Sequence, residues 1–209
     1  MVDTRQQYNH LFDVFVPIGL VVFAIFAGLI LFAAIRYRRR ETPRGPASAT
    51  RAELFYVLAL GGIVALLATL TFRTEAKVDR VAAHPALQVN VTAAKWSWRF
   101  SYPAYGVSVV SSDVHPSVLV VPTDATVRFR MSSLDVIHSF YVPGLRFKRD
   151  AFPGKSTTFD LVFKRARFMG ECAEFCGLHH ADMRFAVEAM PAVEFRSWVS
   201  QQQREQQVR

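Results

Sequence analysis

Two long runs of apolar residues dominate the first third of the chain. Val14–Ile35 holds 22 residues and Leu54–Phe72 holds 19, and neither run contains a charged side chain. Helices of these lengths, which rise about 1.5 Å per residue, cross a hydrocarbon layer of about 30 Å. A helix in the core of a soluble protein rarely keeps every face apolar over such a length. The pattern therefore predicts two membrane-spanning helices, at residues 14–35 and 54–72.

After about Arg73 the pattern changes to short apolar segments separated by turn residues such as Pro153-Gly154. Many segments are β-branched or aromatic and several alternate apolar with polar positions, which is typical of strands. Short strands joined by tight turns predict a β-sandwich or a small barrel. The expected strands lie between Leu87 and Met190 and include Leu87–Thr92, Lys95–Tyr102, Ser117–Val121, Thr126–Met131, Ile137–Val142, Thr157–Phe163 and Arg184–Glu188.

These patterns divide the chain into three parts. Residues 1–13 are an N-terminal segment, residues 14–72 a helical hairpin with its loop at 36–53, and residues 73–209 a β domain. Near the end of that domain Phe195 and Trp198 lie three residues apart, which predicts a short helix at 192–203 packed on the strands.

The loop between the two spans predicts their orientation, because basic residues in short loops stay on the cytoplasmic side. It holds the acids Glu41 and Glu53 against six arginines, Arg36, Arg38, Arg39, Arg40, Arg44 and Arg51. Both termini and the β domain are therefore expected outside, on the periplasmic face of a bacterial inner membrane.

The overall charge changes this picture little. A net charge of +8 and a pI of about 9.9 would suit a nucleic-acid-binding protein, but 51% of the residues are hydrophobic. The arginine-rich loop is better explained as a topology signal, so no nucleic-acid partner is expected. The β domain is itself basic, with 18 Lys and Arg against 13 Asp and Glu.

A cluster of metal-binding side chains marks the segment 172–183 of the β domain. It contains Cys172, Cys176, His180 and Met183, and its thiolate, thioether and imidazole groups suit copper or zinc rather than magnesium or calcium. His138, on a separate expected strand, is the best candidate for one further ligand.

Other interpretations of these residues remain open. Two cysteines in an exported domain often form a disulfide, although a disulfide leaves the spacing of His180 and Met183 unexplained. A zinc site with two cysteines and two histidines is chemically reasonable but needs no methionine. His179 is expected to be a neighbour of the site and not a ligand.

The motifs of the β domain resemble those of subunit II of cytochrome c oxidase. The segment 172–183 has the pattern C-x-E-x-C-G-x-x-H-x-x-M, and 34 residues before its first cysteine His138 stands in D-V-x-H-S-F. Residues 142–154 follow as V-P-x-L-x-x-K-x-D-A-x-P-G, and residues 96–102 have the aromatic pattern W-x-W-x-F-x-Y. The order of all four motifs and the two preceding spans match that family over nearly the whole chain. The resemblance implies a cupredoxin-like Greek-key barrel or sandwich.

The resemblance also implies a function and a set of site residues. It implies a binuclear copper centre, CuA, that takes single electrons from cytochrome c and passes them to the haem of subunit I. Oxygen is reduced there to water, coupled to proton translocation, and subunit III would complete the complex. The implied copper ligands are His138, Cys172, Cys176, His180, Met183 and the carbonyl group of Glu174. The Glu174 carboxylate would reach a magnesium ion shared with subunit I, Trp96 would receive the electron, and Glu53 would stand at a proton-path entrance.

Some features depart from that family and leave alternatives open. His179 stands where the family usually has Asn, and Arg184 where it usually has Pro. Many members of the family present acidic residues to a basic cytochrome c. This domain is instead net basic, and Arg99 follows Trp98, so the identity of the electron donor is open. The alternatives are a CuA subunit of a nitric oxide reductase, a membrane-tethered copper-binding protein, and a β module with a disulfide.

Overall fold

The computed structural model describes residues 3–38, 50–111 and 116–208. The chain divides into two compact units, one of residues 7–76 and the other of residues 1–6 and 77–209. The first unit is helical and the second contains the β domain.

Two long helices make up most of the helical unit, α1 (Thr4–Arg36) and α2 (Thr50–Val78). Both are long and apolar enough to cross a membrane, and the apolar stretch of neither is buried within the protein. The predicted spans 14–35 and 54–72 lie inside these helices, so the helical hairpin is confirmed as two helices of membrane-spanning character. Arg39, Arg40, Arg44 and Glu41, which carry much of the orientation argument, lie outside the described residues.

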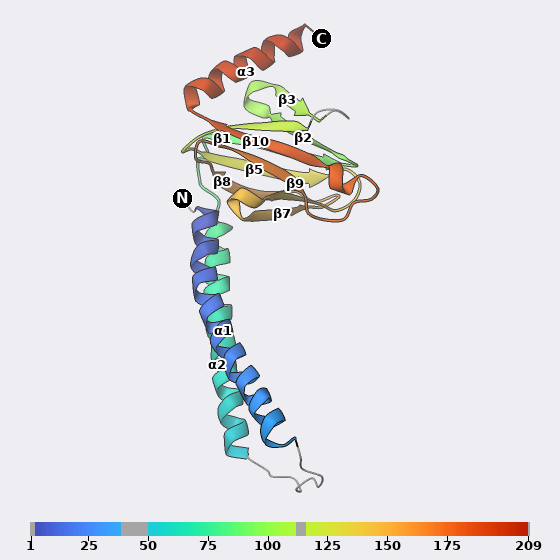
Figure 1. Ribbon diagram of the computed structural model, residues 1–209. Coiled ribbons are helices and arrows are strands. Elements are labelled where there is room, and N and C mark those ends of the chain that lie inside the picture. The colour runs from blue at the N-terminus through green and yellow to red at the C-terminus, as the bar shows by residue number, and fades with distance from the viewer. Residues whose placement is uncertain (1–2, 39–49, 112–115, 209) are drawn as a thin grey trace. The chain divides into compact units, whose positions relative to one another are not determined.

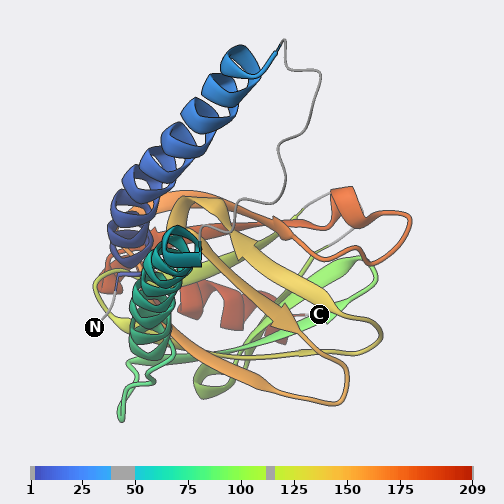
Figure 2. The same ribbon diagram turned by 90° about the horizontal axis from the view of Figure 1, so that it is seen from below.

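The β domain is a sandwich of two five-stranded sheets (Figure 1), which confirms the predicted class of fold. In both sheets, parallel and antiparallel neighbours are mixed, because β1 pairs with β5 and β4 with β10 in parallel. The first sheet has the order β3 (Val107–Val110), β2 (Ser97–Tyr102), β1 (Leu87–Ala94), β5 (Thr126–Ser133) and β8 (Thr157–Val162). The second has the order β4 (Ser117–Pro122), β10 (Arg184–Met190), β9 (Ala166–Cys172), β6 (His138–Val142) and β7 (Phe147–Ala151). Figure 2 shows the two layers from below.

The core between the sheets is built from alternate residues of the strands. In β1 every second side chain, from Leu87 to Ala93, is buried, as a sheet with one buried face requires. Aromatic rings fill the centre, with Phe140 of one sheet stacked on Phe185 at 4.6 Å and in contact with Phe129 of the other. A stiff aromatic core of this kind holds the strand ends, and any site on them, in place.

The predicted C-terminal helix is present as α3 (Ala192–Gln207) and extends beyond Gln203. It lies against β3 and β4, the edge strands of the two sheets on one side of the sandwich (Figure 1). Its Phe195 is buried and its Trp198 packs on Tyr102 with ring centroids 5.2 Å apart. The helix therefore covers the side of the domain where both sheets would otherwise end openly.

Three strands, β3, β7 and β9, are not among the segments named from the sequence, and Trp96 was expected inside a strand. Trp96 lies instead in the two-residue turn between β1 and β2, which places its ring at the end of the sandwich. β9 contains Gly170, an unusual strand residue, because the ring of Phe185 packs directly on its backbone: a Cβ at Gly170 would lie 2.2 Å from that ring.

Candidate metal centre

The candidate ligands meet where three neighbouring strands of the second sheet begin or end. β9 ends at Cys172, β6 begins at His138 on one side of it, and β10 begins after Met183 on the other. The Cys172 N–H donates to the Met183 carbonyl at 3.0 Å, and the Ala173 N–H donates to the Ser139 carbonyl at 3.0 Å. Backbone pairing therefore fixes these three ligand positions, while Cys176 and His180 come from the loop between β9 and β10.

The five side chains form one continuous cluster. The Sγ atoms of Cys172 and Cys176 lie 3.8 Å apart. Nδ1 of His138 lies 3.8 Å from Cys172 Sγ, and Nδ1 of His180 lies 3.6 Å from Cys176 Sγ. The Met183 Sδ lies 3.8 Å from Cys176 Sγ, and the Glu174 carbonyl oxygen lies 3.3 Å from Cys172 Sγ. The structure thus brings together every ligand expected from the sequence.

These distances fit a metal group better than a disulfide. Both cysteines are free, since a disulfide needs an S–S distance of about 2.05 Å. Two sulfur atoms 3.8 Å apart both lie within reach of one metal ion, because a metal–thiolate bond is about 2.3 Å long. The cluster is also buried, with His138 fully covered and Cys172, Cys176 and Met183 each at most 5% exposed. Soft sulfur and imidazole donors in an apolar surround favour copper.

The thiols have unequal acidities. Burial by itself would raise the pKa of Cys172, but hydrogen bonds with His138 and with the backbone at Ser139 and Glu174 lower that pKa to about 7. Burial and the nearby Cys172 charge raise the pKa of Cys176. Two thiolates this close repel each other, so both are deprotonated at neutral pH only when cations balance them. The site is therefore electrostatically suited to hold positive metal ions.

Asp135 orients His138, a role that the sequence motifs do not indicate. Its Oδ1 lies 2.8 Å from His138 Nε2 and accepts the Val136 N–H at 2.6 Å, while its Oδ2 accepts the Lys95 N–H at 2.7 Å. Burial opposes ionisation of Asp135, but these hydrogen bonds lower its pKa to about 2. Burial likewise opposes the charged form of His138, but hydrogen bonds with Cys172 and Asp135 raise its pKa. The carboxylate leaves Nδ1 of His138 directed at the sulfur atoms, as ligand histidines commonly require. The feature of the sequence that could have indicated this role is the position of Asp135 three residues before His138.

Two tryptophans enclose the metal loop. Trp96 donates its indole N–H to the Cys176 carbonyl at 3.2 Å and is half-buried. Gly177 has a φ of +115°, and a Cβ there would lie 3.3 Å from the Trp96 ring, so only glycine fits without strain. Trp98 is fully buried and donates its indole N–H to the Met183 carbonyl at 3.3 Å. Both tryptophans therefore hold backbone groups of the loop that carries the ligands.

The remaining residues predicted from the sequence lie outside the cluster. His179 is exposed and contacts the edge of the Trp96 ring, with centroids 4.8 Å apart, so it is a neighbour as expected. The Glu174 carboxylate points away from the sulfur atoms to Lys148, with Oε2 and Nζ 3.5 Å apart. Glu53 lies in the first turn of α2, in the helical unit, and is exposed.

Comparisons with known proteins show the family to which the chain belongs. The family described as cytochrome c oxidase subunit II, periplasmic domain, matches residues 110–190. A probable cytochrome c oxidase subunit 2 of Rickettsia bellii is 30% identical over 210 residues, covering 91% of this chain and 77% of the relative. The subunit 2 of Bacillus subtilis is 38% identical over 148 residues, covering 66% of this chain and 40% of the relative.

A solved structure shares the fold of the β domain. The periplasmic domain of subunit II of cytochrome oxidase from Bradyrhizobium japonicum matches with a TM-score of 0.55 and 29% identity, covering 60% of this chain and 99% of that one. His138, Cys172, Cys176 and Met183 thus form a candidate copper site within a domain of known family. The chain belongs to the family of cytochrome c oxidase subunit II and is a subunit of a terminal oxidase.

Proposed function

We propose that this chain relays single electrons from cytochrome c through a binuclear CuA centre to the haem of subunit I, where oxygen is reduced to water and protons are translocated. The observation that supports this most directly is the cluster of two unbridged thiols with an imidazole beside each, at 3.8 Å and 3.6 Å. One thiol pair with a histidine on each side offers equivalent places for two metal ions.

The proposed ligands of the two coppers are the Cys172 and Cys176 thiolates, His138 and His180, with Met183 and the Glu174 carbonyl as weaker outer ligands. When bound, the copper pair supplies the one-electron chemistry. The protein's residues fix the ligand positions: Asp135 orients His138, and Trp98 holds the Met183 carbonyl. Ligands that move little when the charge changes keep the energy of reorganisation low.

Trp96 is the proposed point of electron entry. Its ring is partly exposed, and its indole N–H is hydrogen-bonded to the carbonyl group of the ligand residue Cys176. This arrangement gives a short path from the surface to the metal ligands. The donor is cytochrome c or another small electron-transfer protein.

The partners and the location follow from the family. The chain is proposed to lie in a bacterial inner membrane, with both termini and the β domain on the periplasmic face, beside subunit I and subunit III. The Glu174 carboxylate, now 3.5 Å from Lys148, is proposed to reach a magnesium ion shared with subunit I, and Glu53 to stand at a proton-path entrance.

The thiols must stay reduced until the copper binds. A related oxidase subunit, 28% identical to this chain with a TM-score of 0.52, was crystallised as a mixed disulfide with a thioredoxin-like protein. We extend this to the present chain: a thioredoxin-like reductant would keep Cys172 and Cys176 free before the coppers are inserted.

The test is the metal content and electron spin resonance of the oxidase purified from native membranes. We expect about two coppers per copy of this chain in the centre and a paired-copper signal, which Cys172→Ser, Cys176→Ser and His180→Ala each remove. His84→Ala, which changes an exposed histidine of the same domain, should leave the signal intact. A single zinc ion in place of copper would contradict the proposal. Consumption of nitric oxide but not oxygen would identify the alternative, a nitric oxide reductase subunit.

A further inference from the structure

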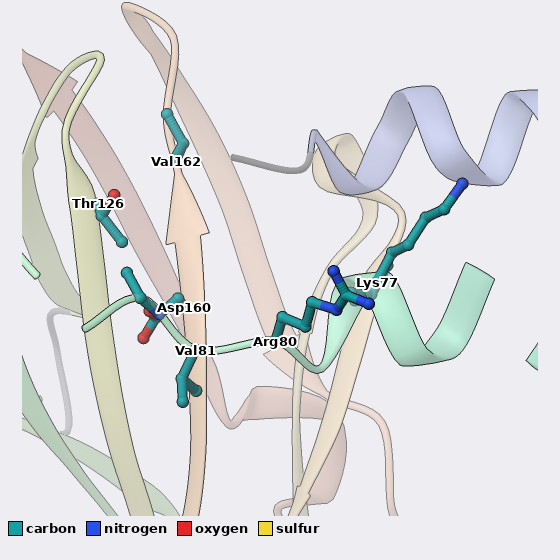
Figure 3. A pocket seen from close by; sticks show the side chains of 8 residues that line it. Lys77, Arg80, Val81, Thr126, Asp160 and Val162 are labelled. Carbon is teal, nitrogen blue, oxygen red and sulfur yellow. The ribbon is translucent and has the colours of Figure 1, made fainter. Parts of the chain in front are cut away.

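A cavity of about 300 Å³ lies where the chain leaves α2 and enters the β domain. Its walls come from the end of α2, the segment that follows it, and strands β5 and β8 (Figure 3). None of its lining residues belongs to the metal cluster; they are Lys77, Val78, Arg80, Val81, Ala82, Thr126, Asp160 and Val162. The cavity is therefore a feature that the proposed electron relay does not explain.

The acid that lines the cavity, Asp160, is already neutralised. Its Oδ1 and Oδ2 accept hydrogen bonds from Nε and Nη2 of Arg128 at 2.8 and 2.9 Å, and Oδ2 also accepts the Ala82 N–H at 2.7 Å. Arg128 in turn donates to the Ala82 carbonyl. These hydrogen bonds hold the segment after α2 against the strands, and the Arg128 guanidinium neutralises the negative charge of the cavity wall.

Two cations of the cavity wall are left without an acid. Asp79, which lies between them in the sequence, is paired with Arg149. Within the ranges that the structure describes, neither Lys77 nor Arg80 forms an ion pair, and both are exposed. Figure 3 shows both side chains extending away from Thr126, Asp160 and Val162 on the strands. The two cations therefore lie on the side of the cavity away from the strands, and Val78, Val81 and Val162 add apolar side chains to its lining.

The position along α2 places these cations at the surface of a membrane. Lys77 follows the last residue of the predicted span, Phe72, by five residues in the same helix. Five residues correspond to about 7.5 Å along the axis, and the headgroup layer extends roughly 5–8 Å beyond the hydrocarbon on each side. Lys77 and the cavity beside it thus lie at the depth of lipid phosphates.

We propose that this cavity binds the phosphate of an anionic phospholipid in the outer leaflet. Lys77 and Arg80 contact the phosphate oxygens, and the valine side chains cover the apolar beginning of the lipid. A zwitterionic lipid carries its own cation, which reduces its attraction to two basic side chains. The inference requires that α2 spans the membrane, but it does not depend on the copper centre.

The test measures the affinity of the full-length chain in detergent for tail-labelled phosphatidylglycerol and phosphatidylcholine at constant ionic strength. We expect phosphatidylglycerol to bind more tightly, and Lys77→Gln with Arg80→Gln to weaken its binding by about fivefold per charge removed. Arg5→Gln with Arg73→Gln removes two cations at the same membrane face outside the cavity and should keep the preference. Val162→Phe fills the cavity without changing its charge and should reduce the preference as well.

Several results would overturn the proposal. A preference that survives Val162→Phe, or falls equally in the Arg5 and Arg73 control, would show general attraction to a basic surface. If inorganic phosphate displaces the labelled phosphatidylglycerol as effectively as unlabelled phosphatidylglycerol does, the cavity is a site for free phosphate. If the oxidase purified with the Lys77→Gln, Arg80→Gln chain lacks subunit I, while that chain binds phosphatidylglycerol as tightly as the native chain does, the two cations bind an acidic protein segment. Circular dichroism confirms that each variant folds, and vesicle flotation tests separately whether the chain inserts into a membrane.

Discussion

Asp135 links the metal cluster to the turn that carries Trp96. One carboxylate oxygen orients the imidazole of His138, and the other accepts the Lys95 N–H, next to Trp96. The proposed point of electron entry and His138, the most buried of the proposed ligands, are thereby tied to the same side chain. The position of both depends on an acid that is not itself a ligand.

Replacing Asp135 with Asn should weaken metal binding without unfolding the domain. The amide cannot accept hydrogen bonds from all the donors that the carboxylate serves, so His138 loses part of its orientation. We expect the copper affinity to fall by about 10- to 100-fold, as measured by competition with a chelator. Asp124→Asn, which removes an exposed acid paired with Lys164, is the matched control and should leave the affinity unchanged. Equal affinities of the Asp135 variant and the native chain would exclude this role.

Gly177 is a second residue whose importance lies in its backbone. Gly177→Ala would place a Cβ at a φ of +115° and within 3.3 Å of the Trp96 ring. We expect a loss of about 1–3 kcal/mol in the unfolding free energy of the metal-loaded protein, with a change in the fluorescence of Trp96. Gly106→Ala, at a φ of +67° with nothing within 4 Å, should cost stability but leave that fluorescence unchanged. Identical fluorescence in both variants would count against the Trp96 contact.

At the scale of elements, α3 completes an edge of the first sheet. Gln206 accepts the Ser108 N–H at 3.4 Å and donates to the Ser108 carbonyl at 2.8 Å, so its amide takes the place of a neighbouring strand along β3. Gln203 makes a similar bond to the Tyr105 carbonyl at 2.8 Å. Open edge strands invite pairing with other chains, and this glutamine-rich helix satisfies that edge.

Gln206→Ala should expose this edge. Loss of a hydrogen bond worth about 1 kcal/mol should speed the exchange of the Ser108 amide hydrogen about fivefold in hydrogen–deuterium exchange. Gln202→Ala removes a side chain that bonds only within α3, to Glu205, and should leave the exchange of β3 unchanged. If both variants exchange like the native chain, the helix protects the edge by packing alone.

The elements that could be predicted from the sequence are those whose pattern follows from burial. Leu87–Ala93 alternates because one face of β1 is buried, and the apolar stretches within α1 and α2 are continuous because no face of them is polar. β9 and β7 could not be predicted in the same way. β9 contains Gly170, placed for the ring of Phe185, and β7 (Phe147–Ala151) holds three charged residues in succession.

The candidate site was predictable for a different reason. Cys172, Cys176, His180 and Met183 lie within one segment of twelve residues, so their spacing shows in the sequence. The hydrogen bonds of Asp135 and the Trp98 bond to the Met183 carbonyl join distant segments. Only the packing of the two sheets brings those partners together, and no local pattern records it.

At the scale of the whole molecule, the two units are stabilised in different ways. The apolar stretches of α1 and α2 are not buried within the protein, so they depend on lipid or on other subunits. The β domain has its own core, and one of its central residues is Tyr102 of β2. Its hydroxyl group donates to the Val120 carbonyl and accepts the Val120 N–H, both at 2.9 Å, which joins the two sheets.

Tyr102 should make the stability of the β domain sensitive to alkaline pH. Burial raises the pKa of Tyr102 above its ordinary value, and its hydrogen bond with Val120 offsets only part of this. The unfolded chain loses this proton near pH 10, whereas the folded chain keeps it to higher pH. The contribution of the protonated Tyr102 hydroxyl to the unfolding free energy is therefore complete below about pH 10. It is lost as the pH rises further, at up to about 1.4 kcal/mol per pH unit.

Tyr102→Phe tests this linkage, because phenylalanine keeps the ring packing and has no proton to lose. We expect the variant to be less stable at neutral pH by about 1–3 kcal/mol, since the Val120 N–H and carbonyl lose their partner. Above about pH 10 its stability should fall less steeply than that of the native chain. The measurement is chemical denaturation of the full-length chain in detergent, followed by near-ultraviolet circular dichroism from neutral to alkaline pH. Lysines and other tyrosines titrate alike in both proteins, so only the difference between the two slopes of unfolding free energy against pH reports Tyr102. Parallel slopes would mean that this hydroxyl is not held protonated in the core.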